Sequence, residues 1–121
     1  MPQESGSVNK FREALVAVTF ADNQTVECVI DTGFDGALML PQFIVARLNL
    51  STVGRLLFEL VGGAQMRADV ALGEIVWLGE PLSVEVIVSA EDDRLIGTEM
   101  LADCKLTVDY LAKSAVIQRD R

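Results

Sequence analysis

Apolar residues in this chain occur in short runs, and turn-forming residues interrupt them about every ten positions. Such spacing is typical of short β-strands and leaves no room for long helices. Strands are expected at residues 12–20, 25–30, 37–40, 55–61, 66–78, 82–88, 95–97, 105–110 and 114–117. Pro41 opens one short helix, and a second is expected after Thr98. The pattern predicts an all-β fold with two short helices, built as a small barrel or sandwich.

The length suits one domain with one core. The chain has 121 residues, of which 50% are hydrophobic and 23% are charged, as is typical of a globular domain. Residues 1–7 are polar and show no periodicity, so we expect a disordered N-terminal tail there. The composition is even over residues 8–121, which predicts a single domain over that range.

The composition also removes several kinds of chemistry. The chain has no histidine, which excludes Ser-His-Asp and Cys-His catalysis and argues against a transition-metal site. A net charge of −8 repels a phosphate backbone, so nucleic acid is not an expected partner. The acidic residues 91–93 lack EF-hand spacing and are interpreted as a solvated loop. We expect no metal and no cofactor, and carboxylates must supply most of the chemistry.

No segment indicates export or membrane insertion. The apolar runs fall far short of the roughly 18 residues that a membrane span needs. Residues 10–21 are similar to a short signal peptide, but Glu13 interrupts its start and Asp22 follows it directly. We therefore expect no membrane partner and a cytoplasmic location, with Cys28 and Cys104 as reduced thiols.

The most informative segment is Val-Ile-Asp-Thr-Gly at residues 29–33. Two apolar residues commit a strand to the core, so Asp31 emerges from it into a poorly hydrated loop. A second carboxylate at short range would let the two groups share one proton, activate a water and protonate a leaving amine. Thr32 offers a hydroxyl to neighbouring backbone, and Gly33 allows a substrate backbone to approach closely. The alternative is a plain turn, because Asp-Thr-Gly is a common turn sequence.

Three segments together resemble the aspartic proteases of the pepsin and retroviral-protease kind. They are residues 29–33 with the short strand that follows, the hairpin around Gly62 and Gly63, and the Leu-Ile-Gly of residues 95–97 ahead of a short helix and strand. The stretch DTGFDGALMLP, residues 31–41, is especially similar to single-domain prokaryotic members. The resemblance covers roughly residues 12–118 and implies a retropepsin-like domain at residues 8–121.

The resemblance implies a single-lobe acid-protease β-barrel that works as a homodimer. One active site needs two Asp-Thr-Gly loops and this chain holds one, so each subunit would donate a catalytic Asp31. Thr32 and Gly33 would support the active-site loop, and a flap hairpin would close over it. The residues assigned to the substrate cleft are Phe34, Asp35, Gly62 and Gly63, and those assigned to a structural motif are Ile96 and Gly97.

The expected function is that of an aspartic endopeptidase, which hydrolyses a peptide or protein substrate with a water activated between two Asp31 carboxylates. The alternative is a catalytically weak or inactive dimeric module that binds an extended peptide or partner strand in the same cleft. The intact Asp-Thr-Gly favours the enzyme, because a binding module needs no pair of buried carboxylates. Phe34 stands where the pepsin-like and retroviral proteases usually have Ala or Ser, which leaves the substrate range open.

Overall fold

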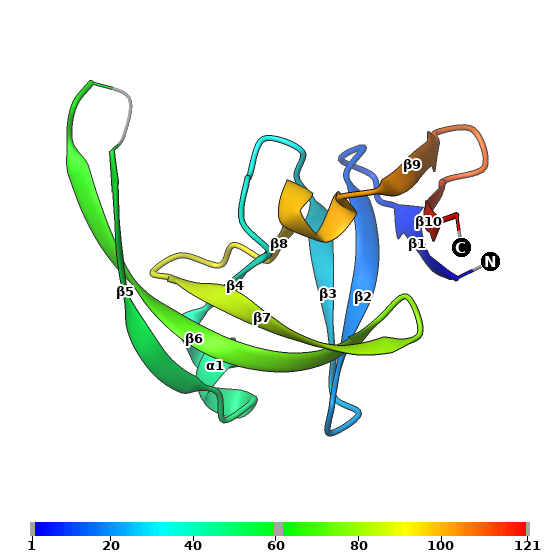
Figure 1. Cartoon of the computed structure of the whole chain (residues 1–121). Coiled ribbons are helices and arrows are strands. Elements are labelled where there is room, and N and C mark those ends of the chain that lie inside the picture. The colour runs from blue at the N-terminus through cyan, green and yellow to red at the C-terminus, as the bar shows by residue number, and fades with distance from the viewer. Residues whose placement is uncertain (1, 60–61, 121) are drawn as a thin grey trace.

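The computed structural model describes residues 2–59 and 62–120, and it consists mainly of β-strands (Figure 1). Its elements in chain order are β1 (Gln3–Val8), β2 (Ala14–Phe20), β3 (Thr25–Ile30), β4 (Leu38–Pro41), α1 (Gln42–Arg47), β5 (Ser51–Glu59), β6 (Gln65–Trp77), β7 (Glu80–Ser89), β8 (Leu95–Ile96), the 3-10 helix η1 (Thr98–Leu101), β9 (Cys104–Asp109) and β10 (Ser114–Arg119). The all-β class expected from the short apolar runs is confirmed.

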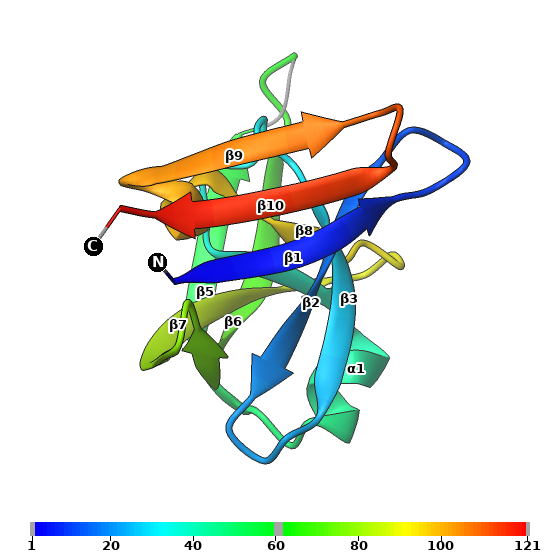
Figure 2. The ribbon, with the colours of Figure 1, turned by 90° about the vertical axis from the view of Figure 1, so that its right-hand side faces the viewer.

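The strands form one sheet in the order β5-β6-β7-β4-β8-β3-β2-β1-β10-β9. β6 also pairs with β2, and this contact closes β6, β7, β4, β8, β3 and β2 into a ring. The hairpin of β5 and β6 reaches away from the ring in Figure 1. The strands β1, β10 and β9 lie side by side across the front of Figure 2.

The core fills the inside of this ring, and α1 packs against it. Strand alternation places one face of each strand inward, as in β2, where Val16, Val18 and Phe20 are buried. The largest fully buried side chains include Leu38, Leu40, Ile44, Ile75 and Ile96. Burying one such aliphatic side chain stabilises a fold by roughly 1.5–3 kcal/mol. The buried Leu38 and Ile96 are paired across β4 and β8, so the core anchors both strands that adjoin the loop described below.

Strand β8 lies between β3 and β4 and sets the position of the loop that joins them. β3 runs parallel to β8, and β4 runs antiparallel to β8 and parallel to β7. The chain leaves β3 after Ile30 and enters β4 at Leu38. Residues 31–37 therefore form a loop whose two ends are held by the same short central strand.

The N-terminus differs from the disordered tail expected at residues 1–7. β1 pairs with β10 from Gln3↔Gln118 to Ser7↔Ser114, and its end also pairs with β2. An added Cβ at Gly6 would overlap the carbonyl of Leu15, so the strands approach closely there. The expectation of a tail is wrong for residues 3–7 because backbone pairing, rather than apolar side chains, holds this strand. Residue 1 lies outside the described residues.

The two short helices have different forms. α1 begins directly after Pro41, which ends β4 and flanks the helix rather than lying in its first turn as the sequence predicts. The chain turns away at Asn49, whose φ is 58°. The second is a single 3-10 turn of 4 residues that begins after Gly97. Neither these nor any other helix in the described residues has the length and apolar character to cross a membrane.

Candidate active site

Asp31 is the first residue after β3 and is fixed on both sides. Its backbone N–H donates to the carbonyl oxygen of Ile96 in β8 at 2.9 Å, and its own carbonyl oxygen accepts from the N–H of Phe34 at 3.1 Å. Its side-chain Oδ1 accepts a hydrogen bond from the N–H of Gly33 at 2.8 Å. The orientation of the carboxylate is therefore determined by the loop itself.

The tip of this loop lies at the surface. Asp31 is half-buried, whereas Thr32 and Gly33 are exposed. An added Cβ at Gly33 would lie 3.2 Å from Oδ1 of Asp31, so glycine leaves room beside the carboxylate. The arrangement presents one carboxylate and one hydroxyl to whatever lies against this face of the chain.

Gly97 contacts the backbone of the Asp31 loop. Its N–H donates to the carbonyl of Ala37 at 2.9 Å, and the next N–H, of Thr98, donates to the carbonyl of Phe34 at 2.8 Å. A Cβ at Gly97 would overlap the carbonyl oxygen of Gly36 and would lie 2.6 Å from that of Phe34. Only glycine fits here. The structure thus brings the Ile96–Gly97 motif and the Asp31 loop into direct contact.

The ring of Phe34 folds back onto its own loop. Its Cζ and Cε1 would lie 2.7 and 2.9 Å from a Cβ added at Gly36, and its Cδ2 would lie 2.7 Å from one added at Gly97. The side chain is half-buried. Phe34 therefore packs against two glycines, a contact that requires the three-dimensional arrangement and has no signature in the sequence.

A hollow opens between the Asp31 loop and the base of the β5–β6 hairpin. Its lining combines apolar residues with three carboxylates; the lining residues are Asp35, Gly36, Ala37, Leu56, Val70, Glu85, Ile87 and Glu99. Asp35, expected along the substrate cleft, lies at this hollow. Leu56 and Val70 come from β5 and β6, so the hairpin forms one wall beside the loop.

The hairpin expected around Gly62 and Gly63 is present. β5 and β6 pair from Ser51↔Leu72 to Glu59↔Gln65. Gly62 and Gly63 lie in the turn between the two strands. Their φ angles of 96° and 86° are values that glycine adopts readily and other residues do not. An added Cβ at either would meet nothing within 4 Å, so this described part of the turn lies in open space. Residues 60 and 61 of the expected strand lie outside the described residues.

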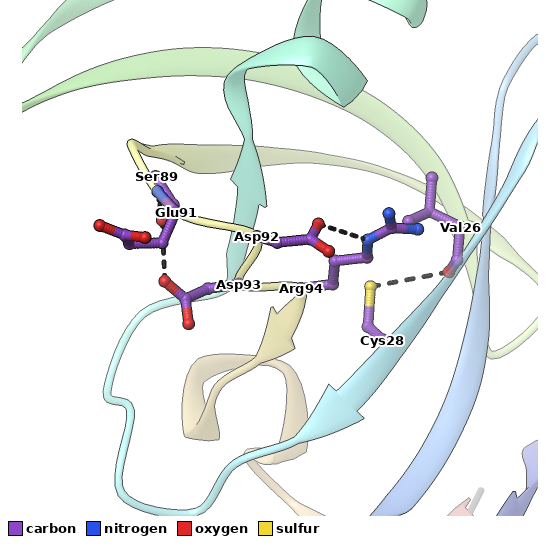
Figure 3. Close-up of polar contacts among 7 residues, drawn as sticks. All are labelled: Val26, Cys28, Ser89, Glu91, Asp92, Asp93 and Arg94. Atoms are coloured by element: carbon purple, nitrogen blue, oxygen red, sulfur yellow. Dashed lines mark hydrogen bonds and ion pairs between the residues drawn. The ribbon is translucent and has the colours of Figure 1, made fainter.

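A hydrogen-bonded loop between β7 and β8 also supports the site, and the sequence did not reveal this role (Figure 3). Ser89 is buried; its Oγ donates to Oδ2 of Asp93 at 2.8 Å and accepts from the N–H of Glu91 at 3.0 Å. The acidic residues here were interpreted only as a solvated loop. The sequence feature that could have indicated this turn is a serine at a strand end followed by Glu and Asp.

Arg94 ends that loop and joins it to β3. Its Nε donates to Oδ1 of Asp92 at 3.3 Å, and its guanidinium lies 5.5 Å from the centre of the Phe43 ring in α1. Its carbonyl oxygen accepts from the N–H of Val29 at 2.7 Å. The loop is thus bound to β3 two residues before Asp31.

Cys28 lies in β3 beside the same arginine (Figure 3). Burial raises the pKa of its thiol to about 12, and the positive charge of Arg94 opposes that rise only in part. Its Sγ contacts the carbonyl oxygen of Val26 at 3.6 Å. Cys28 and Cys104 are both free cysteines. A thiol that holds its proton to this extent is a core residue rather than a nucleophile.

Comparison with other sequences finds a relative. A scan against the sequence models of known protein families finds no match. An uncharacterized protein of Archaeoglobus fulgidus is 30% identical over 107 residues, which cover 83% of this chain and 82% of the relative. The two chains belong to one family.

Comparison with solved structures identifies the fold. A retropepsin-like aspartic protease from Rickettsia conorii matches with a TM-score of 0.64 and 13% identity over 95% of this chain and 89% of that one. The chain has the retropepsin fold. The EIAV protease, solved with an inhibitor, shares this retropepsin fold at a TM-score of 0.60 and 18% identity, over 80% and 92% of the two chains. The simian foamy virus protease matches at a TM-score of 0.54 and 15% identity, over 73% and 91%.

Proposed function

We propose that this chain is an aspartic endopeptidase that acts as a homodimer, with one Asp31 from each subunit in a shared active site. Fold alone does not assign an activity, because one fold hosts many functions. The observation that carries the proposal is the Asp31-Thr32-Gly33 loop at the end of β3, hydrogen-bonded to Ile96 within a retropepsin fold.

The need for a second subunit follows from the number of carboxylates. The sequence contains a single Asp-Thr-Gly, and one carboxylate cannot serve as base toward a water and as acid toward the substrate at the same time. Thr32 and Gly33 are exposed, so a second loop can approach. In the described chain β9 pairs only with β10, which leaves its other edge available to another strand. Both observations support a symmetric pair.

The proposed reaction uses one shared proton. The ionised Asp31 takes a proton from the bound water while the water oxygen attacks the peptide carbonyl carbon, and the protonated Asp31 of the other subunit donates to the carbonyl oxygen. The tetrahedral intermediate then collapses. The C–N bond breaks as the nitrogen receives a proton from the carboxylic acid of the dyad. A hydroxyl of the intermediate gives its proton to a dyad carboxylate as the product carboxyl group forms, so the dyad again holds one proton.

The surrounding residues have supporting roles in this proposal. The Thr32 hydroxyls brace the two loops against each other, and Gly33 leaves room for the substrate backbone. Asp35 lies along the cleft beside the hollow. Gly62 and Gly63 belong to a flap that closes over the dyad and excludes water. The cytoplasmic location expected from the sequence stays a prediction.

The test is a digest of a peptide library with the wild type and with Asp31→Asn. The substituted amide keeps an oxygen that can accept from the N–H of Gly33, so the loop should fold while losing the base. We expect a loss of about 10²–10⁴-fold in cleavage. Glu27→Gln, an exposed acid-to-amide change in β3 that does not line the hollow, is the matched control and should cleave normally. Cleavage that persists in Asp31→Asn would refute the dyad, and peptide binding without cleavage by the wild type would identify a binding module.

A further inference from the structure

We propose that Phe34 is a positioning residue, whose ring is held between Gly36 and Gly97 and fixes the loop that carries Asp31. The catalytic consequence rests on the proposed function, whereas the structural part does not. The sequence leaves two readings of Phe34 open: a ring that narrows a substrate subsite, or one that packs inward. The contacts of the ring support the second, with a specific role for it.

The large ring of Phe34 and the two small residues that it contacts, Gly36 and Gly97, match each other in size. The ring atoms Cζ and Cε1 occupy the space that a Cβ at Gly36 would need, at 2.7 and 2.9 Å from it. The ring atom Cδ2 does the same toward Gly97, at 2.7 Å. Real Cβ atoms do not approach other atoms so closely, since packing in protein interiors is limited by van der Waals contact. A large ring at position 34 therefore requires glycine at both other positions.

The backbone of Phe34 transmits this packing to Asp31. Its N–H donates to the carbonyl of Asp31 at 3.1 Å, and its carbonyl accepts from the N–H of Thr98 at 2.8 Å. Gly33, the residue directly before Phe34, donates its N–H to Oδ1 of Asp31 at 2.8 Å. If the Phe34 ring lost this packing, these hydrogen bonds would no longer be held in position. Displacing a reacting group by about 1 Å can cost a factor of 10² in rate.

A double-mutant cycle tests the matched size. Gly36→Ala should lower the midpoint of thermal unfolding, because the new Cβ meets the ring. In a Phe34→Ala background the same Gly36→Ala change should cost much less, since the ring atoms are gone. Gly97→Ala is the matched control: there the carbonyl oxygens of Gly36 and Phe34 also oppose the Cβ, so Phe34→Ala should not rescue it. Additive effects of Gly36→Ala and Phe34→Ala would overturn the proposed contact.

Kinetics and amide exchange test the positioning. Phe34→Ala should lower kcat by about 10–100-fold with KM nearly unchanged, and Phe34→Leu should restore part of the rate. The cleavage pattern on a peptide library should stay the same. Hydrogen exchange at the N–H of Thr98 should quicken in Phe34→Ala. A broadened cleavage pattern with unchanged kcat would overturn positioning in favour of a subsite.

The two proposals fail in different ways. A wild type that dimerises but cleaves no peptide refutes the endopeptidase, and the exchange rate at Thr98 and the double-mutant cycle then still decide the role of the ring. Unchanged exchange in Phe34→Ala, together with additive stabilities, refutes the positioning role even when the wild type is an active peptidase.

Discussion

The backbone N–H of Asp31 donates to the carbonyl oxygen of Ile96 at 2.9 Å. This bond attaches the proposed catalytic residue to β8, a strand that the chain reaches only after the whole β5–β6–β7 excursion. The position of Asp31 thus depends on residues that are distant in the sequence: Gly97 beneath the loop, and the β7–β8 loop that leads into β8.

Gly97→Ala should destabilise the fold strongly. Its Cβ would overlap the carbonyl oxygen of Gly36 and lie 2.6 Å from that of Phe34, and backbone atoms cannot move aside as a flexible side chain can. We expect a loss of about 2–3 kcal/mol in the free energy of unfolding, measured by urea titration. Gly54→Ala in β5 is the control, since its Cβ meets nothing within 4 Å; it should change stability by less than about 0.5 kcal/mol. Equal stability of the two variants would contradict the close packing under the loop.

Ser89→Ala should weaken the β7–β8 loop. The buried hydroxyl bonds both to Asp93 and to the N–H of Glu91, and its removal leaves these groups without that partner. The expected cost is about 1–2 kcal/mol, with a lower kcat because the loop leads into β8. Ser83→Ala, in the exposed part of the same strand where the hydroxyl bonds Glu74, should cost less than about 0.5 kcal/mol. A fully active, fully stable Ser89→Ala would show that the loop does not support the site.

The stability of the protein should fall at alkaline pH because of Cys28. Burial raises the pKa of its thiol from the ordinary value of 9.0 to about 12. The unfolded chain then releases this proton from about pH 9, while the folded chain keeps it, so rising pH favours unfolding through this window. The contribution is fully present below pH 9, and about 1.4 kcal/mol of it is lost at pH 10.

Cys28→Ala provides the comparison for that effect. The variant is less stable at neutral pH because it leaves a cavity, but it lacks the thiol. The difference in unfolding free energy between the wild type and Cys28→Ala should therefore shrink by about 1.4 kcal/mol from pH 8 to pH 10. All other groups are common to the two proteins, so their contributions cancel in this difference. Parallel stability curves over this range would mean that the folded protein does not hold the thiol proton.

Much of this fold is readable in the sequence because inward and outward residues alternate. β3 spans the predicted residues, and the helix after Pro41 follows from proline at its start. β1 was missed, since its polar residues are held by backbone pairing with β10. The Asp31 loop and its Ile96–Gly97 support could be located by motif, but the contact of Phe34 with Gly36 depends on a ring direction that no local pattern encodes.

Substrate charge should matter under the proposed function. The chain carries a net charge of −8, and Asp35, Glu85 and Glu99 line the hollow beside the active-site loop. Peptides with Lys or Arg near the scissile bond should be cleaved faster than matched peptides with Glu, and added salt should reduce the difference. Glu85→Gln should reduce this preference more than Glu27→Gln, an exposed position in β3 that does not line the hollow. A preference for acidic peptides would contradict an electrostatic role of these groups.

Subunit mixing gives the sharpest test of a shared active site. If each dimer needs two Asp31 carboxylates, a mixed dimer of wild type and Asp31→Asn has only one of them. It therefore lacks either the base or the acid and should be inactive. An equal mixture that has exchanged subunits contains roughly one quarter wild-type dimers, so the rate per wild-type chain should fall to about half of its unmixed value. Phe11→Ser, an exposed change in the β1–β2 turn that keeps Asp31, serves as a neutral partner. Mixing it with the wild type should leave the rate per Asp31-containing chain unaltered. If adding Asp31→Asn has no effect on the rate per wild-type chain after subunit exchange, each chain works alone, and the carboxylate that completes the site must then come from within one subunit.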